Sequence, residues 1–533
     1  MSRPLAPFLA ALLLVPLSCN GGSGSNPFDS ASGTGDATTA HDATGATSSP
    51  PPTSGPSPST GDVVDDTSGG GPIFDLPDGD TDGPNPGSCL DVADVGTTVG
   101  CQFYAVDLDQ AQVFENQQFA VAVSNVNVAL SAEVIVEEKQ GGAWVTVDGP
   151  VSVGALDLHV FPLPNKVQLG TGLSVGGSYR ISSDVPIVAY QFNPLTMGWW
   201  SSDASMLFPS VAWDTLSHVV GWGPGTGKAY ATVVAAEDAT HVEVRPSVDT
   251  VGGPGIPPGL AGGVFSFDLD EGDVAQIAVS AENASLVGTR IEADKPIGVF
   301  TGHECAFVPG DLYACDHLEE QVAGLRLWGT RFAASRVPPR HPAAPEDSLW
   351  QIQASEDDTT ITFDAPIPVT GLPAGPQVLD AGEVLEIFVG GPPAAPGDFY
   401  VEADKPIAVL DYMTGWEHLG EQIGDPAMLQ LSPIEQFLDR YVVLVPNQWS
   451  WDYLVITRPQ GVGIELDGTP IDDSAFVASA NGWEVARVLA EDGVHQLRGD
   501  EPFSVAVVGY DLADSYAYMG GSGTGLINPE PAG

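Results

Sequence analysis

The sequence predicts an all-β protein that contains four tandem repeats of roughly 100 residues each. A motif in which an aspartate is followed two residues later by a proline occurs at Asp184, Asp294, Asp404 and Asp500, at intervals of 110, 110 and 96 residues. The segments around this motif alternate apolar and polar residues with the period of two that half-buried strands have. No segment has the spacing of a convincing amphipathic helix.

The N-terminus has the features of a secretory signal peptide. Arg3 precedes an apolar run over residues 5–17, which is too short to span a bilayer. The run leads to Cys19 through a small residue, and this resembles the bacterial lipobox, in which the cysteine is lipidated. We therefore expect residues 1–18 to be a lipoprotein signal peptide, with a plain secretory signal as the alternative. Asn20 follows the cysteine, and the resemblance to Gram-negative lipoproteins implies a lipid anchor in the outer membrane, facing the cell surface or the periplasm; otherwise the protein is secreted.

Residues 19–88 are expected to form a disordered acidic linker. After the cysteine this stretch contains no Lys, Arg or Glu and ten Asp, and most of the rest is Gly, Ser, Thr, Pro and Ala. Such a composition buries too little apolar surface to offset the entropy of ordering the chain. Residues 78–83 resemble the start of a calcium loop, but Cys89 stands where that loop needs a bidentate Glu. We expect solvated linker here, with calcium binding as the alternative.

The net charge excludes one class of function. The chain has 17 Lys and Arg residues against 70 Asp and Glu residues, which gives a formal net charge of −53 at pH 7. A nucleic-acid binder needs a basic stripe that displaces counterions from the phosphates, and this acidic surface is repelled by nucleic acid and by anionic lipid. We expect no nucleic-acid partner, and membrane contact only through the lipid anchor.

After the linker, the chain divides into four β repeats over residues 89–200, 201–323, 324–424 and 425–533. Proline lacks an N–H group, so the Asp-x-Pro motif would interrupt a central ladder and is expected to mark a tight turn between two strands. Repeats of this length favour tandem β-sandwich modules, and the alternative is a pseudo-fourfold, propeller-like ring.

Two further segments recur between the second and third repeats. Residues 231–244 correspond to residues 350–363, and residues 265–274 correspond to residues 378–387. Each segment alternates with a period of two around a turn rich in Asp or Gly, which is typical of a β-hairpin with one buried face.

Four cysteines remain after the one in the lipobox. An exported protein meets an oxidising compartment, so we expect disulfides between residues that are close in sequence. The cysteines form two such short-range pairs, Cys89 with Cys101 and Cys305 with Cys315.

The stretch after the second Asp-x-Pro motif is the most specific in the sequence. Residues 302–305 read Gly-His-Glu-Cys, and residues 315–321 read Cys-Asp-His-Leu-Glu-Glu-Gln. Together with residues 190–194 and 203–209, these motifs resemble the N-terminal domain of the IgG Fc-binding protein family, over most of residues 115–520. The resemblance implies a non-catalytic extracellular module. The chain lacks long cysteine-rich repeats and shows no Fc-contacting residue, so antibody binding is not transferred to it.

Several polar residues in these motifs are candidates for a site. The residues concerned are His303, Asp316, His317, Glu320 and Gln321. His303 and His317 flank the second cysteine pair with the residue types of a Cys₂His₂ zinc site, which is the alternative to a disulfide. The third repeat has His418 and Glu421 in a similar stretch without cysteines. We therefore expect each His and Glu pair to hydrogen-bond within a short structural turn, with a metal role as the alternative.

Tryptophans in loop-like contexts are candidate contacts for a ligand. Exposed tryptophans often contact sugars or partner proteins, whereas the alternative is that they close the cores between modules. The residues are Trp199, Trp200, Trp416, Trp449 and Trp451.

The remaining motifs give no positive evidence of catalysis. Residues 223–228 resemble a phosphate loop but lead into a strand, so we expect neither a nucleotide nor any other cofactor. The chain has no Gly-x-Ser-x-Gly elbow and no His-Glu-x-x-His motif. We expect a cell-surface lipoprotein that acts as a non-catalytic binding or adhesion module for an extracellular protein or glycan. The alternative is a secreted hydrolase of extracellular polysaccharide that uses a carboxylate pair.

Overall fold

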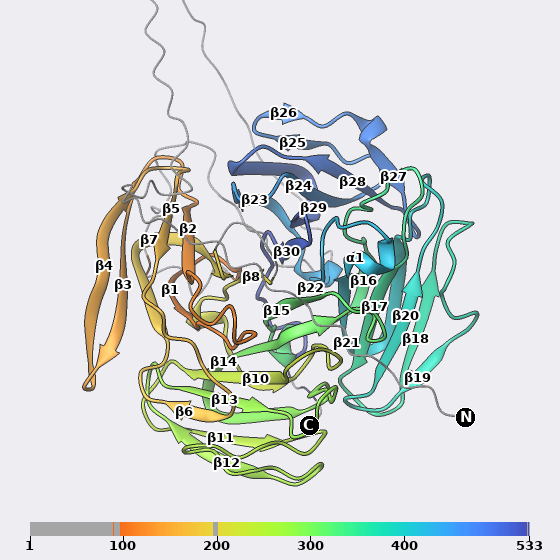
Figure 1. The fold of residues 1–533 in the computed structure, drawn as a ribbon. Coiled ribbons are helices and arrows are strands. Elements are labelled where there is room, and N and C mark those ends of the chain that lie inside the picture. Colours follow the sequence, from red (N-terminus) through yellow and green to blue (C-terminus); the bar gives the residue numbers. More distant parts are fainter. Residues whose placement is uncertain (1–88, 90–95, 196–200, 530, 532–533) are drawn as a thin grey trace, which may run out of the picture.

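The computed structural model describes residues 89, 96–195, 201–529 and 531. The described residues are almost entirely β-structure, arranged in four antiparallel sheets (Figure 1). The predicted signal peptide, Cys19 and most of the predicted linker lie outside the described residues. Helical structure in the described part of the chain is limited to the α-helix α1 and four short 3₁₀ turns, at Trp416–Leu419, Ser210–Ala212, Leu325–Leu327, Ile434–Gln436 and Asp473–Ala475. No helix in that part is long and apolar enough to cross a membrane.

The first two sheets are each organised around one long strand, which is β7 in the first sheet and β14 in the second. The first sheet contains β1 (Gly100–Ala105), β2 (Ala120–Asn125), β3 (Ala132–Gln140), β4 (Ala143–Val153), β5 (Leu158–Pro162), β7 (Tyr179–Asn193) and β8 (Asp203–Met206). The second contains β6 (Gly172–Ser174), β9 (Asp214–His218), β10 (Ala229–Ala235), β11 (Thr240–Arg245), β12 (Phe265–Leu269), β13 (Val274–Ala278), β14 (Arg290–Phe307) and β15 (Cys315–Gln321).

The third and fourth sheets have the same plan around β21 and β29. The third contains β16 (Gly329–Ala334), β17 (Ser348–Ala354), β18 (Thr359–Asp364), β19 (Gln377–Leu379), β20 (Val384–Val389), β21 (Phe399–Met413) and β22 (Ala427–Gln430). The fourth contains β23 (Leu438–Val445), β24 (Trp451–Pro459), β25 (Ile464–Leu466), β26 (Thr469–Pro470), β27 (Phe476–Ala478), β28 (Trp483–Leu489), β29 (Gly493–Asp511) and β30 (Asp514–Met519).

The four sheets surround a common centre (Figure 1). The last strand of each sheet is the innermost one: β8 and β22 both contact β15 and β30, so the four inner strands β8, β15, β22 and β30 form a ring of neighbours. Segments from the first and last copies are joined as well, because the Thr98 N–H donates to the Ser522 carbonyl at 2.9 Å. The all-β prediction with four repeats is confirmed, and the copies are arranged as in the ring alternative.

The Asp-x-Pro motif lies inside each long strand, so the prediction of a tight turn is wrong. The two halves of a long strand pair with different neighbours: residues 290–293 of β14 pair with β11, and residues 297–303 pair with β10. The proline stands where the ladder changes partner, and its missing N–H therefore breaks no ladder there. In the first three copies the aspartate accepts a backbone N–H from the adjacent strand, as Asp294 does from His241 at 2.8 Å.

The apolar residue that follows this proline enters the core in every copy, as the repeat predicts. Ile187, Ile297, Ile407 and Phe503 are at most 3% exposed, and the core is continuous between copies. Burying one such side chain stabilises the fold by about 1.5–3 kcal/mol.

Many aspartates are explained by paired acidic turns at the rim of the ring. In the second copy, Asp270 accepts the Ala239 N–H at 2.9 Å, and Asp238 accepts the Glu271 N–H at 3.1 Å. The third copy repeats the pair, since Asp380 and Asp357 accept the N–H groups of Asp358 and Ala381 at 3.2 and 3.0 Å. These carboxylates replace backbone partners in the turns, which is an ordinary structural role for aspartate.

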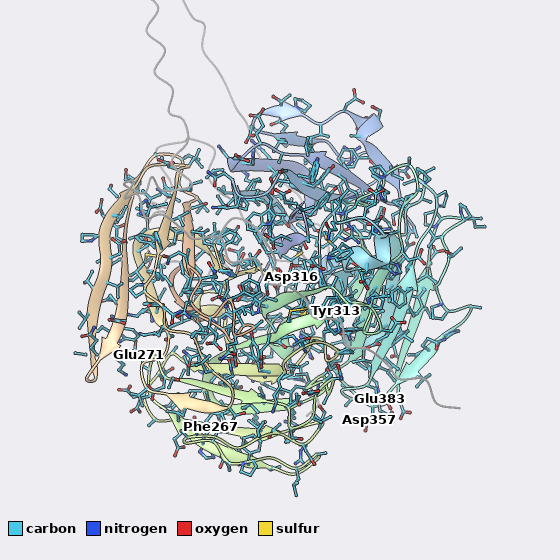
Figure 2. The ribbon with its side chains drawn as sticks, in the orientation of Figure 1. Phe267, Glu271, Tyr313, Asp316, Asp357 and Glu383 are labelled. Carbon is cyan, nitrogen blue, oxygen red and sulfur yellow. A yellow bond between two sulfur atoms is a disulfide. The ribbon has the colours of Figure 1, made fainter. Side chains whose placement is uncertain are left out.

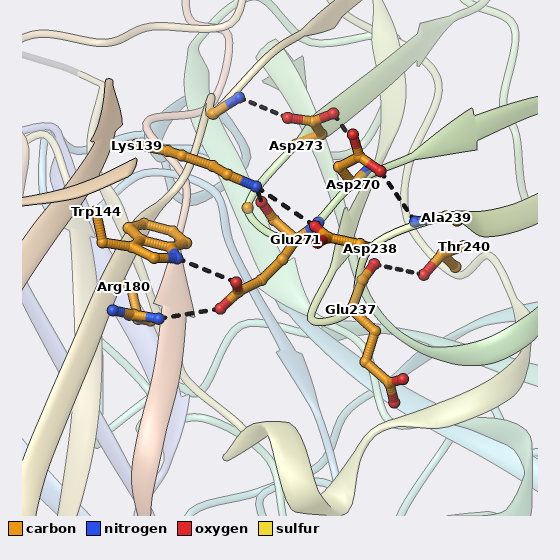
Figure 3. A network of polar contacts seen from close by, with 12 residues as sticks. Lys139, Trp144, Arg180, Glu237, Asp238, Ala239, Thr240, Asp270, Glu271 and Asp273 are labelled. Carbon is orange, nitrogen blue, oxygen red and sulfur yellow. Dashed lines mark hydrogen bonds and ion pairs between the residues drawn. The ribbon is translucent and has the colours of Figure 1, made fainter. Parts of the chain in front are cut away.

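One of these turns joins the first two sheets (Figure 3). The Glu271 carboxylate accepts hydrogen bonds from Trp144 at 3.1 Å, from Arg180 at 3.1 Å and from Tyr104 at 2.9 Å. Burial raises the pKa of Glu271, but the hydrogen bonds from Trp144 and Tyr104 and the charge of Arg180 outweigh it and leave the pKa below its ordinary value. Glu271 is therefore held as a carboxylate at the junction.

Candidate functional site

The candidate site is the end of the ring where each long strand turns back into its inner strand. We call the described connections the crown: residues 308–314, 414–426 and 512–513. Neighbouring segments are joined, because Gly415 N–H donates to the Val308 carbonyl at 2.7 Å and Gly424 N–H donates at 2.7 Å to the carbonyl of Asp511, the last residue of β29 before the crown. Three copies therefore contribute to one continuous surface.

The crown carries two strongly exposed apolar side chains. Tyr313 is 74% exposed and Leu512 is 52% exposed, although both precede buried inner strands. Figure 2 places Tyr313 near the middle of the ring, whereas Phe267 and Asp357 lie toward its rim. Exposed aromatic and aliphatic groups on a rigid frame are suited to contact a partner or the apolar face of a sugar.

The predicted tryptophans have different environments. Trp451, beside the crown, is 40% exposed and packs against Tyr510, with ring centroids 5.8 Å apart. Trp416 is half-buried at the start of α1. Trp449 is 6% exposed and packs on Tyr516 at 4.4 Å, so it is a core residue and its predicted role as a ligand contact is wrong. Trp199 and Trp200 lie outside the described residues.

Both predicted disulfides are present. Cys89 is bonded to Cys101 and Cys305 to Cys315, with Cα atoms 5.9 and 5.0 Å apart. The second bridge links the end of β14 to the start of β15 and closes the crown segment that carries Tyr313.

The histidines beside that bridge are structural. The Cys305 N–H donates to His303 Nδ1 at 3.0 Å, and His303 Nε2 lies 3.0 Å from the Gly223 carbonyl. Burial lowers the pKa of His303 to about 4 and that of His317 to about 3, so both imidazoles are neutral. With both cysteines bonded to each other, no group of three or more His, Cys, Asp or Glu side chains in the described ranges is placed to hold a metal ion.

The predicted His and Glu turns do not form. His317 lies in β15, and neither of its ring nitrogens has a hydrogen-bond partner. His418 stacks on Phe388, with ring centroids 6.0 Å apart, while Glu421 lies 3.5 Å from His341. The similar letters in the two repeats fall at different places in the fold, because the third copy has a longer connection between its long and inner strands.

Glu320 and Gln321 lie at the opposite end of the inner strands. Gln321 accepts the Phe208 N–H at 2.7 Å, and both residues line a cavity of about 30 Å³ with Met206 and Met519. Glu320 Oε2 and Gln321 Nε2 have no partner in this cavity, which has room for roughly two waters. It is a place for ordered solvent rather than for a large ligand.

The centre of the ring is occupied by Asp203, which is 1% exposed. Its carboxylate accepts the N–H groups of Ala204 at 2.9 Å, Glu319 at 3.1 Å and Ala517 at 3.4 Å. Burial raises the pKa of Asp203, and these donors, together with the Met428 N–H, oppose the rise. Because the four N–H groups belong to the four inner strands, one side chain joins all four copies.

Sequence reasoning did not predict this role of Asp203, nor the burial of Asp425 and Asp514 beside it. The available signal was weak. An aspartate occurs at or just before each inner strand, but the connections that precede it differ in length, so the alignment of the copies is lost there.

The chain matches a family model described as IgGFc binding protein over residues 203–509. It is similar to the IgGFc-binding protein of Homo sapiens, with 27% identity over 320 residues, which cover 58% of this chain and 6% of the human protein. No solved structure matches it. The family match runs from the inner strand of the first copy to the long strand of the fourth and covers more than half of the chain; the chain therefore belongs to the IgGFc binding protein family.

Proposed function

We propose that this protein is a non-catalytic extracellular binding module and that its crown is the recognition surface. The observation that carries the proposal is the exposure of Tyr313, Trp451 and Leu512 on and beside a face where three copies meet. The frame below is rigid, because the Cys305–Cys315 bridge and hydrogen bonds between copies fix the crown segments. A backbone that is already held in place loses less entropy on binding, which favours affinity.

Family membership supports a binding role and an extracellular protein as the partner. The name of the human relative refers to IgG Fc, and that statement belongs to the human protein, of which this chain spans 6%. For this chain we propose an extracellular protein or glycan. We further propose that lipidation at Cys19 holds the module at the outer membrane, which agrees with the acidic linker that follows.

The experiment is a glycan and protein array probed with the mature chain, followed by affinity measurements on the hits. Replacing Tyr313 or Trp451 by Ala should weaken binding by tenfold or more, since exposed aromatic anchors dominate such interfaces. Leu260 is 73% exposed outside the crown, so Leu260→Ala is the matched control and should bind as the wild type does. Equal loss in the control, or no loss in the crown variants, would place the recognition surface elsewhere.

The hydrolase alternative is tested on the same hits. If a bound polysaccharide is cleaved, and cleavage is lost when one exposed acid is replaced while binding persists, the protein is an enzyme. Binding without released fragments supports the module.

A further inference from the structure

Three aspartates occupy the same place in three of the copies. In the second, third and fourth copies, Gln321, Gln430 and Met519 pair with long-strand residues that lie equally far from the Asp-x-Pro motif. Counting back five residues along the chain from each of these gives Asp316, Asp425 and Asp514. The first copy has Ser201 at this position. We call Asp316, Asp425 and Asp514 the axial aspartates.

The axial aspartates are buried and incompletely bonded. They are 0%, 2% and 6% exposed. Asp514 accepts the Ser202 hydroxyl at 2.7 Å, but Asp316 Oδ2 and Asp425 Oδ1 have no hydrogen-bond partner. An ionised carboxylate in such a place is costly unless a counter-charge or a set of donors satisfies it.

The surrounding elements supply one counter-charge, that of Arg340, which lowers the pKa of Asp425 but does not outweigh the effect of burial. Arg340 approaches Asp425, but its guanidinium donates to Glu346 at 3.0 Å, to the Ile423 carbonyl at 3.1 Å and to Thr414 at 2.7 Å. The other charged groups that act on the axial aspartates are acids, namely Asp203, Glu417 and Asp511. His317 is neutral, because burial lowers its pKa to about 3.

Protons are the remaining way to neutralise the cluster, since its side chains are not placed to hold a metal ion in the described structure. Burial raises the pKa of Asp425 to about 8 and that of Asp514 to about 7. Burial also raises the pKa of Asp316, and the charges of Asp514 and Asp425 raise it further. A protonated carboxyl gains an O–H donor and can share a hydrogen bond with its neighbour.

The axial aspartates are connected directly to the crown. Asp316 follows Cys315, at the end of the segment that carries Tyr313, and Asp514 follows residues 512–513. Asp425 lies within the connection that contains α1, one residue before its end, and its N–H donates to Ser515 at 3.1 Å, which ties this connection to β30. A change in charge among these residues therefore acts on all three crown segments.

We propose that Asp316, Asp425 and Asp514 form a proton-linked lock. When the three carboxyls are protonated, the crown segments stay packed against the inner strands, and when the carboxyls ionise, the crown segments loosen. A carboxyl whose folded-state pKa is raised contributes stability that is fully present below its unfolded pKa. That stability is lost as the pH rises through the folded pKa, so the crown should loosen between about pH 6 and pH 9. The action of this lock does not depend on whether the crown binds a ligand.

The test is hydrogen exchange of the mature chain from pH 6 to pH 9, corrected for the intrinsic pH dependence of exchange. In the wild type, peptides covering residues 308–314 and 414–424 should lose protection by tenfold or more as the pH rises. Asn is a neutral isostere of protonated Asp, so Asp425→Asn and Asp514→Asn should flatten this dependence. Asp311 lies exposed in the crown, away from the axis, and Asp311→Asn should behave as the wild type does.

Other results would overturn the lock. It is wrong if the wild-type crown keeps its protection at pH 9, if both axial variants retain the full pH dependence, or if neither variant folds at pH 6. Millimolar Ca²⁺ that restores protection at pH 9 in the wild type, but not in Asp425→Asn, would also overturn it and assign the cluster to a cation.

Discussion

Replacing Asp203 by Ala should open the centre of the ring. Of the backbone N–H groups that the carboxylate accepts, three lie at 2.9, 3.1 and 3.4 Å, on three different inner strands. Alanine leaves these donors buried and unpaired, and each buried unpaired donor costs about 1–3 kcal/mol. Allowing for the long third bond and for water that enters the space, we expect a loss of roughly 3–6 kcal/mol. This is a large part of the about 5–15 kcal/mol that stabilises a typical domain.

Equilibrium unfolding in urea, followed by tryptophan fluorescence, measures this loss. Asp203→Gly adds a sharper test, because a small carboxylate such as formate can enter the space and accept the same N–H groups. Formate should raise the midpoint of Asp203→Gly in a saturable way and leave the wild type unchanged. Asp311→Ala, which removes an exposed carboxylate, is the control and should shift stability by less than about 0.5 kcal/mol. An Asp203→Ala protein within about 1 kcal/mol of the wild type would refute the reasoning.

Three further predictions concern the repeat, the first junction and the N-terminus. Ile297→Asp buries an unpaired carboxylate and should lower the free energy of unfolding in urea by several kcal/mol. Lys295→Ala removes hydrogen bonds to two turn carbonyls and should lower it by about 1 kcal/mol or less. Equal losses in the two variants would contradict the repeat alignment. Glu271→Gln should lower the free energy of unfolding by about 1–3 kcal/mol. Because the pKa of Glu271 is lowered in the folded protein, its contribution to stability is present above its unfolded pKa and disappears as the pH falls through its folded pKa. An unchanged dependence of stability on acid pH in the variant would contradict this. Intact-mass analysis should show an acylated Cys19 at the mature N-terminus, and Cys19→Ser should release the protein from membranes; an unmodified N-terminus elsewhere would refute lipidation.

Patterns within single repeats were enough to predict much of the fold. Alternation with a period of two gives strands with one buried face, and it correctly placed Ile297 and its counterparts in the core. The two disulfides followed from the oxidising compartment that an exported protein meets and from cysteines that lie 12 and 10 residues apart. The fourfold recurrence of Asp-x-Pro fixed the number of copies.

The same motif shows where local reasoning stopped. The proline predicted a turn because it lacks an N–H group. A strand that changes partners, however, has a position where no ladder hydrogen bond is needed. That position exists only because different strands of the same copy pair with the two halves of the long strand. The match between His317 and His418 failed for a related reason. A sequence alignment matches residue types along the chain, whereas strand pairing sets a residue's position in the sheet. Because the third copy has a longer connection between its long and inner strands, the two histidines occupy different positions.

The sequence by itself determined that this protein is all-β, that it has four copies of one unit and that the apolar residue after each Asp-x-Pro motif is buried, since these depend on patterns within about 15 residues. Only the tertiary structure decided that the copies close into a ring and that Asp203 accepts N–H groups from all four inner strands. The axial aspartates likewise come together from three copies. These groups lie roughly a hundred or more residues apart along the chain, and they meet because the inner strands of different copies pack against one another, which no single repeat encodes.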